Sequence, residues 1–538
     1  MGRIRLEEIN YKYPGVNEKA LSDVNISIDE GTFMLVLGAS GSGKSSLARV
    51  IGNLIPDFYG GVISGKVHVE EETAILFQDP EKQLIMNKVE RELALPLENR
   101  GVSEQDMLRR VSEALSFMNL NDLKDRQLSS LSGGQKQKVA LASTLVGGQR
   151  VLILDEPISQ LDPVNSDEIL EIVNRLNRDH GYTVILVEQR VDKCIHLADR
   201  ILYMDRGKVA FDGEPEAFVQ ESFKDFLPEI MRLQLGFCEE VFKNVKTGRK
   251  VLNAMKKTKA FNAIDASLDS NRSMKVLGDF ADSKEVAIKV RKMKFAYHKE
   301  RPIFDRLDLE ILKGQSLAIM GANGSGKTTL VKLICGLLKP SRGDVLANGG
   351  IGYVSQNPND HLFHDTLVEE LEFTMKHSGV VDPHLSDDVL KDLGLYEMKD
   401  RNPRDLSGGE RQRAAIGTVL VKKPDILILD EPTRGLDLKS KNRVQKIIES
   451  LHERGTTTII VTHDIDFAAS SCQNGLLLFD GQVASYGDIR SVLQGGLYYT
   501  TTMNRLFRGF CDGIFTLEEG RAVFQDMVKA KAFLEDIS

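Results

Sequence analysis

A glycine-rich segment occurs twice in this chain, and this repeat constrains the fold more than any other feature. GASGSGKS at residues 38–45 returns as GANGSGKT at residues 321–328. Two further motifs repeat in the same order: LSGGQ at 131–135 with LSGGE at 406–410, and VLILDEP at 151–157 with ILILDEP at 426–432. The chain is therefore a duplication of a whole domain, because the period is too long for a solenoid repeat.

Each half has the pattern of an α/β domain. One apolar run precedes the glycine-rich segment, and a second, at 151–154 or 426–429, ends in Asp-Glu. Strands that alternate with helices indicate a mainly parallel sheet, with the chemistry at the carboxyl ends of its strands. We expect a first domain at 1–225, a helical tail and linker at 226–285, a second domain at 286–495 and a C-terminal appendage at 496–538.

Composition and charge exclude several function classes. The 538 residues carry a net charge of -8, so no general positive field attracts nucleic acid or an anionic membrane. No apolar run approaches the roughly 18 residues of a membrane span, and the N-terminus has no apolar signal core. The five cysteines form no CxxC pair, which indicates reduced thiols without a metal or redox role. We expect a protein that stays in the cytosol.

The repeated glycine-rich segments predict phosphate-binding loops. Glycine lets backbone N–H groups turn toward phosphate oxygens where a Cβ would interfere. The lysine of such a loop contacts the β- and γ-phosphates, the next hydroxyl contacts Mg²⁺, and the following helix presents its positive dipole end. The expected residues are Gly38, Ser40, Gly41, Gly43, Lys44, Ser45 and Ser46 in the first half, and Gly321, Asn323, Gly324, Gly326, Lys327, Thr328 and Thr329 in the second.

Adjacent carboxylates end the second apolar run of each half. Asp155 and Asp430 follow four apolar residues, a position from which they can hold Mg²⁺ through water. Glu156 and Glu431 come next and can polarise the attacking water as general bases.

LSGG(Q/E), together with these flanking motifs, resembles the signature of ATP-binding-cassette (ABC) ATPases over nearly the whole of both halves. The resemblance implies two P-loop nucleotide-binding domains in tandem, each with a mainly parallel core sheet, an antiparallel subdomain and a helical subdomain. It also implies hydrolysis of ATP with Mg²⁺ at two composite sites of a head-to-tail pseudo-dimer. In these sites the γ-phosphate held by one half would meet the signature of the other: Ser132, Gly133 and Gly134, or Ser407, Gly408 and Gly409.

The same resemblance assigns further residues. Gln78 and Gln356 match the Q-loop glutamine, which senses Mg²⁺ or the attacking water. Tyr13 and Tyr297 match the aromatic residue that stacks on adenine, although a tyrosine of the core would give the same pattern. The D-loop aspartates would be Asp162 and Asp437.

The switch position differs between the halves. The second half has VTHD, in which His463 matches the family's histidine that contacts the γ-phosphate, whereas the first half has VEQR with Gln189. A glutamine amide cannot become cationic, so we expect the site with Gln189 to be slower than the site with His463.

Two function classes remain for a two-cassette chain without a membrane span. Residues 77–99, 227–236 and 498–509 resemble the fused ATPase of energy-coupling-factor importers, which take up vitamins, their precursors or metal ions. This resemblance implies an integral-membrane coupling subunit received at 79–92 and 357–370, a substrate-binding membrane subunit, no nucleic acid, and a peripheral location on the cytoplasmic face of the cell membrane.

The alternative is a soluble tandem-cassette factor that acts on ribosomes. Such factors usually have NHLD in the D-loop, where this chain has SQLD and RGLD. Lysines between the halves, however, keep contact with ribosomal RNA open.

Overall fold

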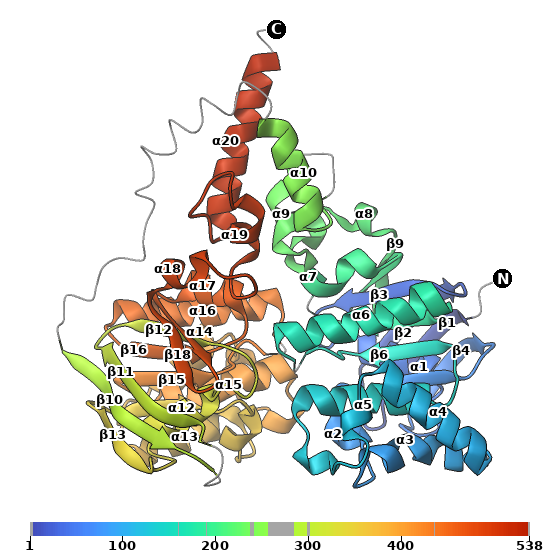
Figure 1. Ribbon diagram of the computed structural model, residues 1–538, viewed down its shortest axis with the longest axis horizontal. Coiled ribbons are helices and arrows are strands. Elements are labelled where there is room, and N and C mark those ends of the chain that lie inside the picture. The colour runs from blue at the N-terminus through green and yellow to red at the C-terminus, as the bar shows by residue number, and fades with distance from the viewer. Residues whose placement is uncertain are drawn as a thin grey trace. The chain divides into compact units, whose positions relative to one another are not determined.

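The computed structural model describes residues 4–159, 161–189, 191–236, 242–256, 285–297, 302–434 and 436–535 (Figure 1). The chain divides into two compact units, residues 1–228 and 229–538.

The core sheet of the first unit has six strands in the order β5-β6-β7-β3-β8-β9. Five are parallel: β5 (Thr73–Leu76), β6 (Val151–Asp155), β7 (Thr183–Val187), β3 (Phe33–Gly38) and β8 (Arg200–Asp205). The last, β9 (Lys208–Gly213), is antiparallel to β8. Every residue of β3, β6 and β7 is buried, which explains why these strands appear in the sequence as continuous apolar runs.

An antiparallel sheet and a set of helices complete the first unit. The sheet has the order β2-β1-β4, with β1 at Ile4–Lys12, β2 at Leu21–Ile28 and β4 at Val62–Val69. The helices are α1 (Lys44–Ile51), α2 (Pro80–Gln83), α3 (Val89–Glu98), α4 (Glu104–Phe117), α5 (Gly133–Leu145), α6 (Pro163–His180), α7 (Val191–Cys194) and α8 (Pro215–Phe218).

The second unit repeats this architecture. Its core sheet has the order β14-β15-β16-β12-β17-β18, formed by Ile351–Val354, Ile426–Asp430, Thr457–Val461, Ser316–Met320, Asn474–Phe479 and Gln482–Asp488. Its antiparallel sheet is β11-β10-β13, at Phe304–Leu312, Val286–Phe295 and Arg342–Ala347. The matching helices are α12 (Lys327–Ile334), α13 (Leu367–His377), α14 (Leu385–Asp392), α15 (Gly408–Leu420), α16 (Leu438–Glu453), α17 (Ile465–Ser471) and α18 (Ile489–Gln494). The expected duplication and α/β fold class are confirmed.

A helical cluster of the second unit joins the middle of the chain to its C-terminal part. It contains α9 (Glu229–Gln234), α10 (Val245–Lys256), α19 (Thr502–Phe507) and α20 (Leu517–Glu535), and α20 lies beside α9 (Figure 1). The rings of Phe242 and Phe524 meet edge to face at 5.6 Å, and Arg249 donates a hydrogen bond to the carbonyl oxygen of Arg508. Helices α9 and α10 thus pack on the C-terminal appendage. The expected linker at 265–275 lies outside the described residues.

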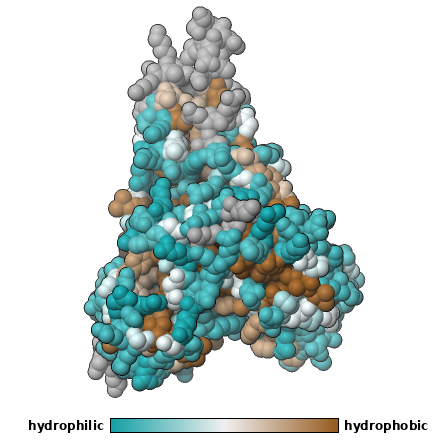
Figure 2. All heavy atoms as spheres, turned by 90° about the vertical axis from the view of Figure 1, so that its right-hand side faces the viewer, coloured by the Kyte–Doolittle hydropathy of each residue, from teal (hydrophilic) through white to brown (hydrophobic). Residues whose placement is uncertain are grey.

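The described residues also show the character of the surface and the state of the cysteines. The face in Figure 2 is mainly hydrophilic, with hydrophobic side chains collected in a few areas. Within the described ranges, no helix is both long and apolar enough to cross a bilayer. The four described cysteines form no disulfide, and burial raises the pKa of the Cys472 thiol to about 12. The fifth, Cys238, lies outside the described residues.

Candidate functional site

The two phosphate-binding loops connect β3 to α1 and β12 to α12. Gly38 has a φ of 151°, and a Cβ built there would lie 2.4 Å from the carbonyl oxygen of Met204. At the equivalent Gly321 the Cβ would lie 2.1 Å from the carbonyl oxygen of Leu478. Only glycine fits at these two positions. Four loop residues are exposed, as phosphate ligands must be: Ser40, Gly41, Asn323 and Gly324.

Both loop lysines are buried inside their own loops. The Lys44 ammonium donates hydrogen bonds to the carbonyl oxygens of Gly38 and Ala39, at 2.9 and 2.8 Å. Lys327 donates the same pair of bonds within its loop, both at 2.9 Å. Each cation is therefore fixed in the glycine-rich turn that precedes a helix N-terminus, the arrangement that a phosphate group requires.

The hydroxyl that follows each lysine contacts the aspartate at the end of the neighbouring strand. Ser45 Oγ donates to Asp155 Oδ1 at 3.2 Å, and Thr328 is hydrogen-bonded to Asp430. Burial raises the pKa of Asp155, and it raises the pKa of Asp430 to about 6, with the neighbouring Glu431 as a further cause. Paired hydroxyl and carboxylate oxygens in a buried position fit Mg²⁺, whose charge would offset this burial.

The glutamates that follow these aspartates have an unusual backbone conformation. Glu156 has a φ of 49° and Glu431 a φ of 53°, in a region that non-glycine residues rarely adopt. Their N–H groups donate to the carbonyl oxygens of Val187 and Val461, each at 2.8 Å. The turn fixes each carboxylate at the carboxyl end of the core sheet, and such strain is typical of functional sites.

Two glutamine amides hold the first glutamate. Gln189 Nε2 donates to Glu156 Oε1 at 2.6 Å, and Gln78 Nε2 donates to Glu156 Oε2 at 2.8 Å. Burial, together with the neighbouring carboxylates of Glu188 and Asp155, raises the pKa of Glu156 to about 7. Both oxygens of the expected general base are thus occupied by neutral donors.

The second glutamate has a different partner. His463 Nδ1 lies 2.7 Å from Glu431 Oε2, and both side chains are largely buried. Gln356 is exposed and makes no hydrogen bond to Glu431 among the described residues. The switch residue therefore reaches the glutamate in both halves, whereas the Q-loop glutamine does so in the first half alone.

Two residues near these sites were not predicted. Glu188 is 1% exposed; its carboxylate accepts the N–H groups of Ile158 at 3.2 Å and of Gln189 at 2.8 Å. The second half has Thr462 at this position, so an alignment of VEQR with VTHD would have pointed to it. Tyr353, which takes the place of Ile75, lies with its hydroxyl 3.5 Å from Asp430 Oδ2.

The two expected adenine-stacking tyrosines are not equivalent. The Tyr13 hydroxyl accepts a hydrogen bond from Arg49 at 2.7 Å and lies 3.1 Å from Ser46 Oγ. Tyr297 is 55% exposed, and its hydroxyl lies 3.5 Å from Thr329 Oγ1. Both rings therefore stand beside the helix that follows their own phosphate loop, with Tyr13 the more firmly held.

The signature motifs begin helices α5 and α15. Ser132 and Ser407 are the N-caps, and each forms a reciprocal capping box with the residue three positions later, Gln135 or Glu410. In each motif the first glycine, Gly133 or Gly408, is exposed and the second, Gly134 or Gly409, is buried. The exposed helix starts suit an anion such as a phosphate.

The D-loop aspartates also cap helices. Asp162 accepts the N–H of Asn165 at 2.9 Å at the start of α6, and Asp437 accepts the N–H of Ser440 at 2.8 Å at the start of α16. Their observed role within each unit is therefore local.

A buried glutamate supports the loop that follows each Q-loop. Glu92, 3% exposed, accepts the N–H groups of Ile85 and Met86 at 2.9 and 2.7 Å. Glu370, also 3% exposed, holds the matching loop in the same way. Each loop presents one exposed apolar side chain: Ile85 is 76% and Phe363 is 77% exposed.

Comparison with known proteins identifies the family. The ABC transporter family model matches residues 21–159 and 304–434, which contain the phosphate loops, signatures and carboxylate pairs of both halves. This chain belongs to the ABC transporter family. A protein of Bacillus anthracis, provisionally named an ABC transporter ATP-binding protein, is 37% identical over 534 residues, 94% of this chain and 95% of the relative. One from Methanosarcina mazei is 33% identical over 91% of this chain and 89% of its own length. The chain is thus an ABC ATPase with two tandem domains.

Solved structures share the fold along most of the chain. The archaeal ribosome recycling factor aABCE1, solved with a ribosomal stalk protein, has a TM-score of 0.60 at 22% identity and covers 90% of both chains. A protein titled RNase-L Inhibitor has a TM-score of 0.59 at 21% identity, over 94% of this chain and 93% of its own.

These structures correct the expected partners. The resemblance of residues 77–99, 227–236 and 498–509 to importer ATPases led us to expect membrane coupling and substrate-binding subunits and no nucleic acid. The same fold, over nine-tenths of this chain, occurs in a ribosome recycling factor, so the expectation of membrane subunits is wrong. The exclusion of nucleic acid was also wrong, because a net charge of -8 describes the whole chain and not its local surfaces.

Proposed function

We propose that the chain hydrolyses Mg-ATP at two unequal composite sites, which form when its halves associate head to tail, and that their closing and opening perform work on a macromolecular partner. One observation carries this proposal: each half brings a buried lysine, a hydroxyl–aspartate pair and a strained glutamate to one end of its core sheet. The signature helix starts remain exposed, as expected for groups that receive a phosphate from the other half.

In each proposed site the protein supplies position and charge. Lys44 or Lys327 would stabilise the negative charge that develops on the transferred phosphoryl group. Glu156 or Glu431 would orient the attacking water and accept its proton. Mg²⁺, held by the Ser45–Asp155 or Thr328–Asp430 pair, would neutralise charge on the phosphate oxygens.

We propose that the site with His463 is the faster one. It would comprise Lys327, Gln356, Asp430, Glu431 and His463, closed by residues 132–134. The slower site would comprise Lys44, Gln78, Asp155, Glu156 and Gln189, closed by residues 407–409. The two amides on Glu156 support this order, because they occupy both oxygens of the base and neither amide can carry a positive charge.

The partner of this cycle has two candidates. The fold comparison favours a factor that acts on ribosomes, as the recycling factor does, since the likeness covers 90% of this chain and includes both cassettes. The names of the relatives favour transport. Within the transport candidate, we favour an energy-coupling-factor importer because of the motifs at 77–99, 227–236 and 498–509. In that case the chain would work at the cytoplasmic face of the membrane.

A trapped variant separates the candidates. Glu156→Gln with Glu431→Gln should bind ATP and stay closed, because the water-activating groups are lost while the phosphate ligands remain. For a ribosome factor, the trapped protein should sediment with ribosomal subunits after ATP addition, and wild type should not. For an importer, it should instead block vitamin or metal-ion uptake by cells and leave ribosome profiles unchanged. If both profiles and uptake are unaffected while ATP binding is intact, the proposed coupling is wrong.

A further inference from the structure

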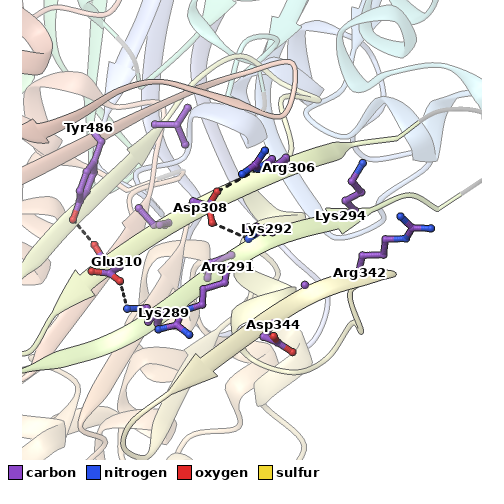
Figure 3. A pocket seen from close by; sticks show the side chains of 14 residues that line it. Lys289, Arg291, Lys292, Lys294, Arg306, Asp308, Glu310, Arg342, Asp344 and Tyr486 are labelled. Carbon is purple, nitrogen blue, oxygen red and sulfur yellow. Dashed lines mark hydrogen bonds and ion pairs between the residues drawn. The ribbon is translucent and has the colours of Figure 1, made fainter.

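The outer face of the antiparallel sheet in the second unit contains a hollow lined with cations (Figure 3). Its volume is about 1040 Å³, and it extends over β10, β11 and β13, with Tyr486 of β18 at one end. The basic residues that line it are Lys289, Arg291, Lys292, Lys294, Arg306 and Arg342. It lies outside every motif used by the ATPase.

A β-bulge concentrates these cations. The register of β10 with β11 shifts between Val290 and Met293, and Lys292 within this bulge has a φ of 45°. As a result Arg291 and Lys292, although consecutive, are both exposed, whereas a regular strand would turn one of them inward. On the neighbouring strand Arg342 lies opposite Lys294, which extends the cationic surface to β13.

The acidic residues of the hollow do not neutralise it. Six cations face three carboxylates, those of Asp308, Glu310 and Asp344. Glu310 forms an ion pair with Lys289, and Asp308 lies 3.9 Å from Arg306. Within the described part of the chain, the guanidinium groups of Arg291 and Arg342 have no ion-pair partner, so two planar, permanently charged groups stand open to an anion.

The duplication shows that the fold alone does not require this charge. The first unit has the same bulge: Glu8 has a φ of 54°, and its N–H donates to Asn25 as the N–H of Lys292 donates to Asp308. When the two sheets are compared strand by strand, Glu7 of the first unit lies at the position of Arg291 in the second, and Ser64 lies at the position of Arg342. At these two positions the first sheet has a glutamate and a serine where its duplicate has two arginines, which indicates a separate use for the second sheet.

We infer that this hollow binds the phosphodiester backbone of an RNA strand. Guanidinium groups match phosphate oxygens in a bidentate geometry, and the half-exposed ring of Tyr486 at the edge of the hollow can stack on a base. A concave surface receives a strand, whereas a planar anionic bilayer would reach only its rim. The inference goes beyond the ATPase and does not depend on which partner the ATPase drives.

The test is binding of a fluorescent single-stranded oligouridine of ~12 nucleotides to the full chain, measured by anisotropy at several salt concentrations. Arg291→Glu with Arg342→Glu should weaken RNA binding about tenfold or more. It should also reduce the slope of log affinity against log salt concentration by roughly one to two, because fewer counterions are released. The matched control, Arg5→Glu with Lys66→Glu, makes the same charge change on the equivalent sheet of the first unit and should bind as wild type does.

Each outcome decides the inference. Selective loss in the Arg291/Arg342 variant, with its ATPase activity unchanged, supports it. An equal loss of RNA binding in both variants would overturn the inference, because it would show that the RNA is attracted by general charge. A wild-type protein that binds no RNA would exclude the site. Binding to vesicles of phosphatidylcholine and phosphatidylserine, but not to RNA, would assign the hollow to a membrane surface and overturn the inference.

Discussion

The side-chain amide of Gln189 donates a 2.6 Å hydrogen bond to Glu156, at the position where the second half sets His463 against Glu431. Gln189 therefore contacts the glutamate of its own half, as the histidine does in the second half. The amide holds the carboxylate, but it offers no positive charge to a phosphate.

His463→Ala should lower steady-state ATPase activity more than Gln189→Ala. Loss of one donor to a transition state costs about 10²–10³ in rate, and a charged donor contributes more than a neutral one. We expect His463→Ala to approach that range and Gln189→Ala to fall well short of it, with Gln189→His raising turnover. Equal losses would show that the two sites contribute equally.

Lys44→Ala with Lys327→Ala should abolish ATP binding and hydrolysis. Each lysine is the one cation that its loop motif supplies, and each is buried within that loop. Nucleotide binding by fluorescence and phosphate release are the measurements. Turnover that persisted in the folded double variant would contradict the assignment of both loops.

Glu156→Gln should stabilise the nucleotide-free protein at pH 8. In the folded protein the pKa of Glu156 is raised from 4.5 to about 7, so folding favours the protonated carboxyl, and this contribution is lost as the pH rises through about 7. Glutamine mimics the protonated form. The variant should gain up to about 3 kcal/mol in the free energy of unfolding at pH 8, and almost none below pH 4.5. A Tm difference that does not depend on pH would exclude this explanation.

Glu188→Thr should loosen the first site without unfolding it. Glu188 accepts the N–H groups of Ile158 and Gln189, and its charge lies close to Glu156. Threonine, as at Thr462, can accept at most part of these bonds. We expect the stabilisation of Glu156→Gln at pH 8 to shrink in the Glu188→Thr background, since one cause of the raised pKa is removed. An unchanged difference would show that the charge of Glu188 does not raise the pKa of Glu156.

Glu92→Ala and Glu370→Ala should each destabilise their unit by about 2–4 kcal/mol, because two backbone N–H groups lose the buried carboxylate that accepts their hydrogen bonds. Ile85→Ser and Phe363→Ser on the same loops are the matched controls, since these side chains are largely exposed and their loss should leave the Tm nearly unchanged. Thermal unfolding compares the four variants. Similar Tm values for all four would mean that the glutamates do not support the loops.

The sequence predicted much of each site because its chemistry lies within short motifs. The lysine, hydroxyl and carboxylates occur at fixed positions beside apolar strands, and the parallel sheet then brings the strand ends together. Contacts between motifs were harder to predict. Glu188 reaches Ile158, and Tyr353 reaches Asp430, only because neighbouring strands are parallel and in register.

The packing of helices that lie far apart in the chain also could not be predicted from the sequence pattern. The segment at 226–285 was predicted to be a helical tail and linker. In the structure α9 and α10 pack on α19 and α20, and Gly520 brings α20 close to Met503 and Leu233. The hydrophobic periodicity of each segment does not indicate which other segment it packs against, so the pairing is seen only in the tertiary fold.

The pairing of α9 and α10 with α20 sets an order of events during synthesis. Leu233 and Phe242 leave the translating machinery long before Phe524, whose ring Phe242 contacts, has been added to the chain. Until then their apolar surfaces stay uncovered, and nascent chains in this condition are prone to aggregate. A stop codon before residue 517 would leave both catalytic sets encoded in full and still release a protein with this surface exposed.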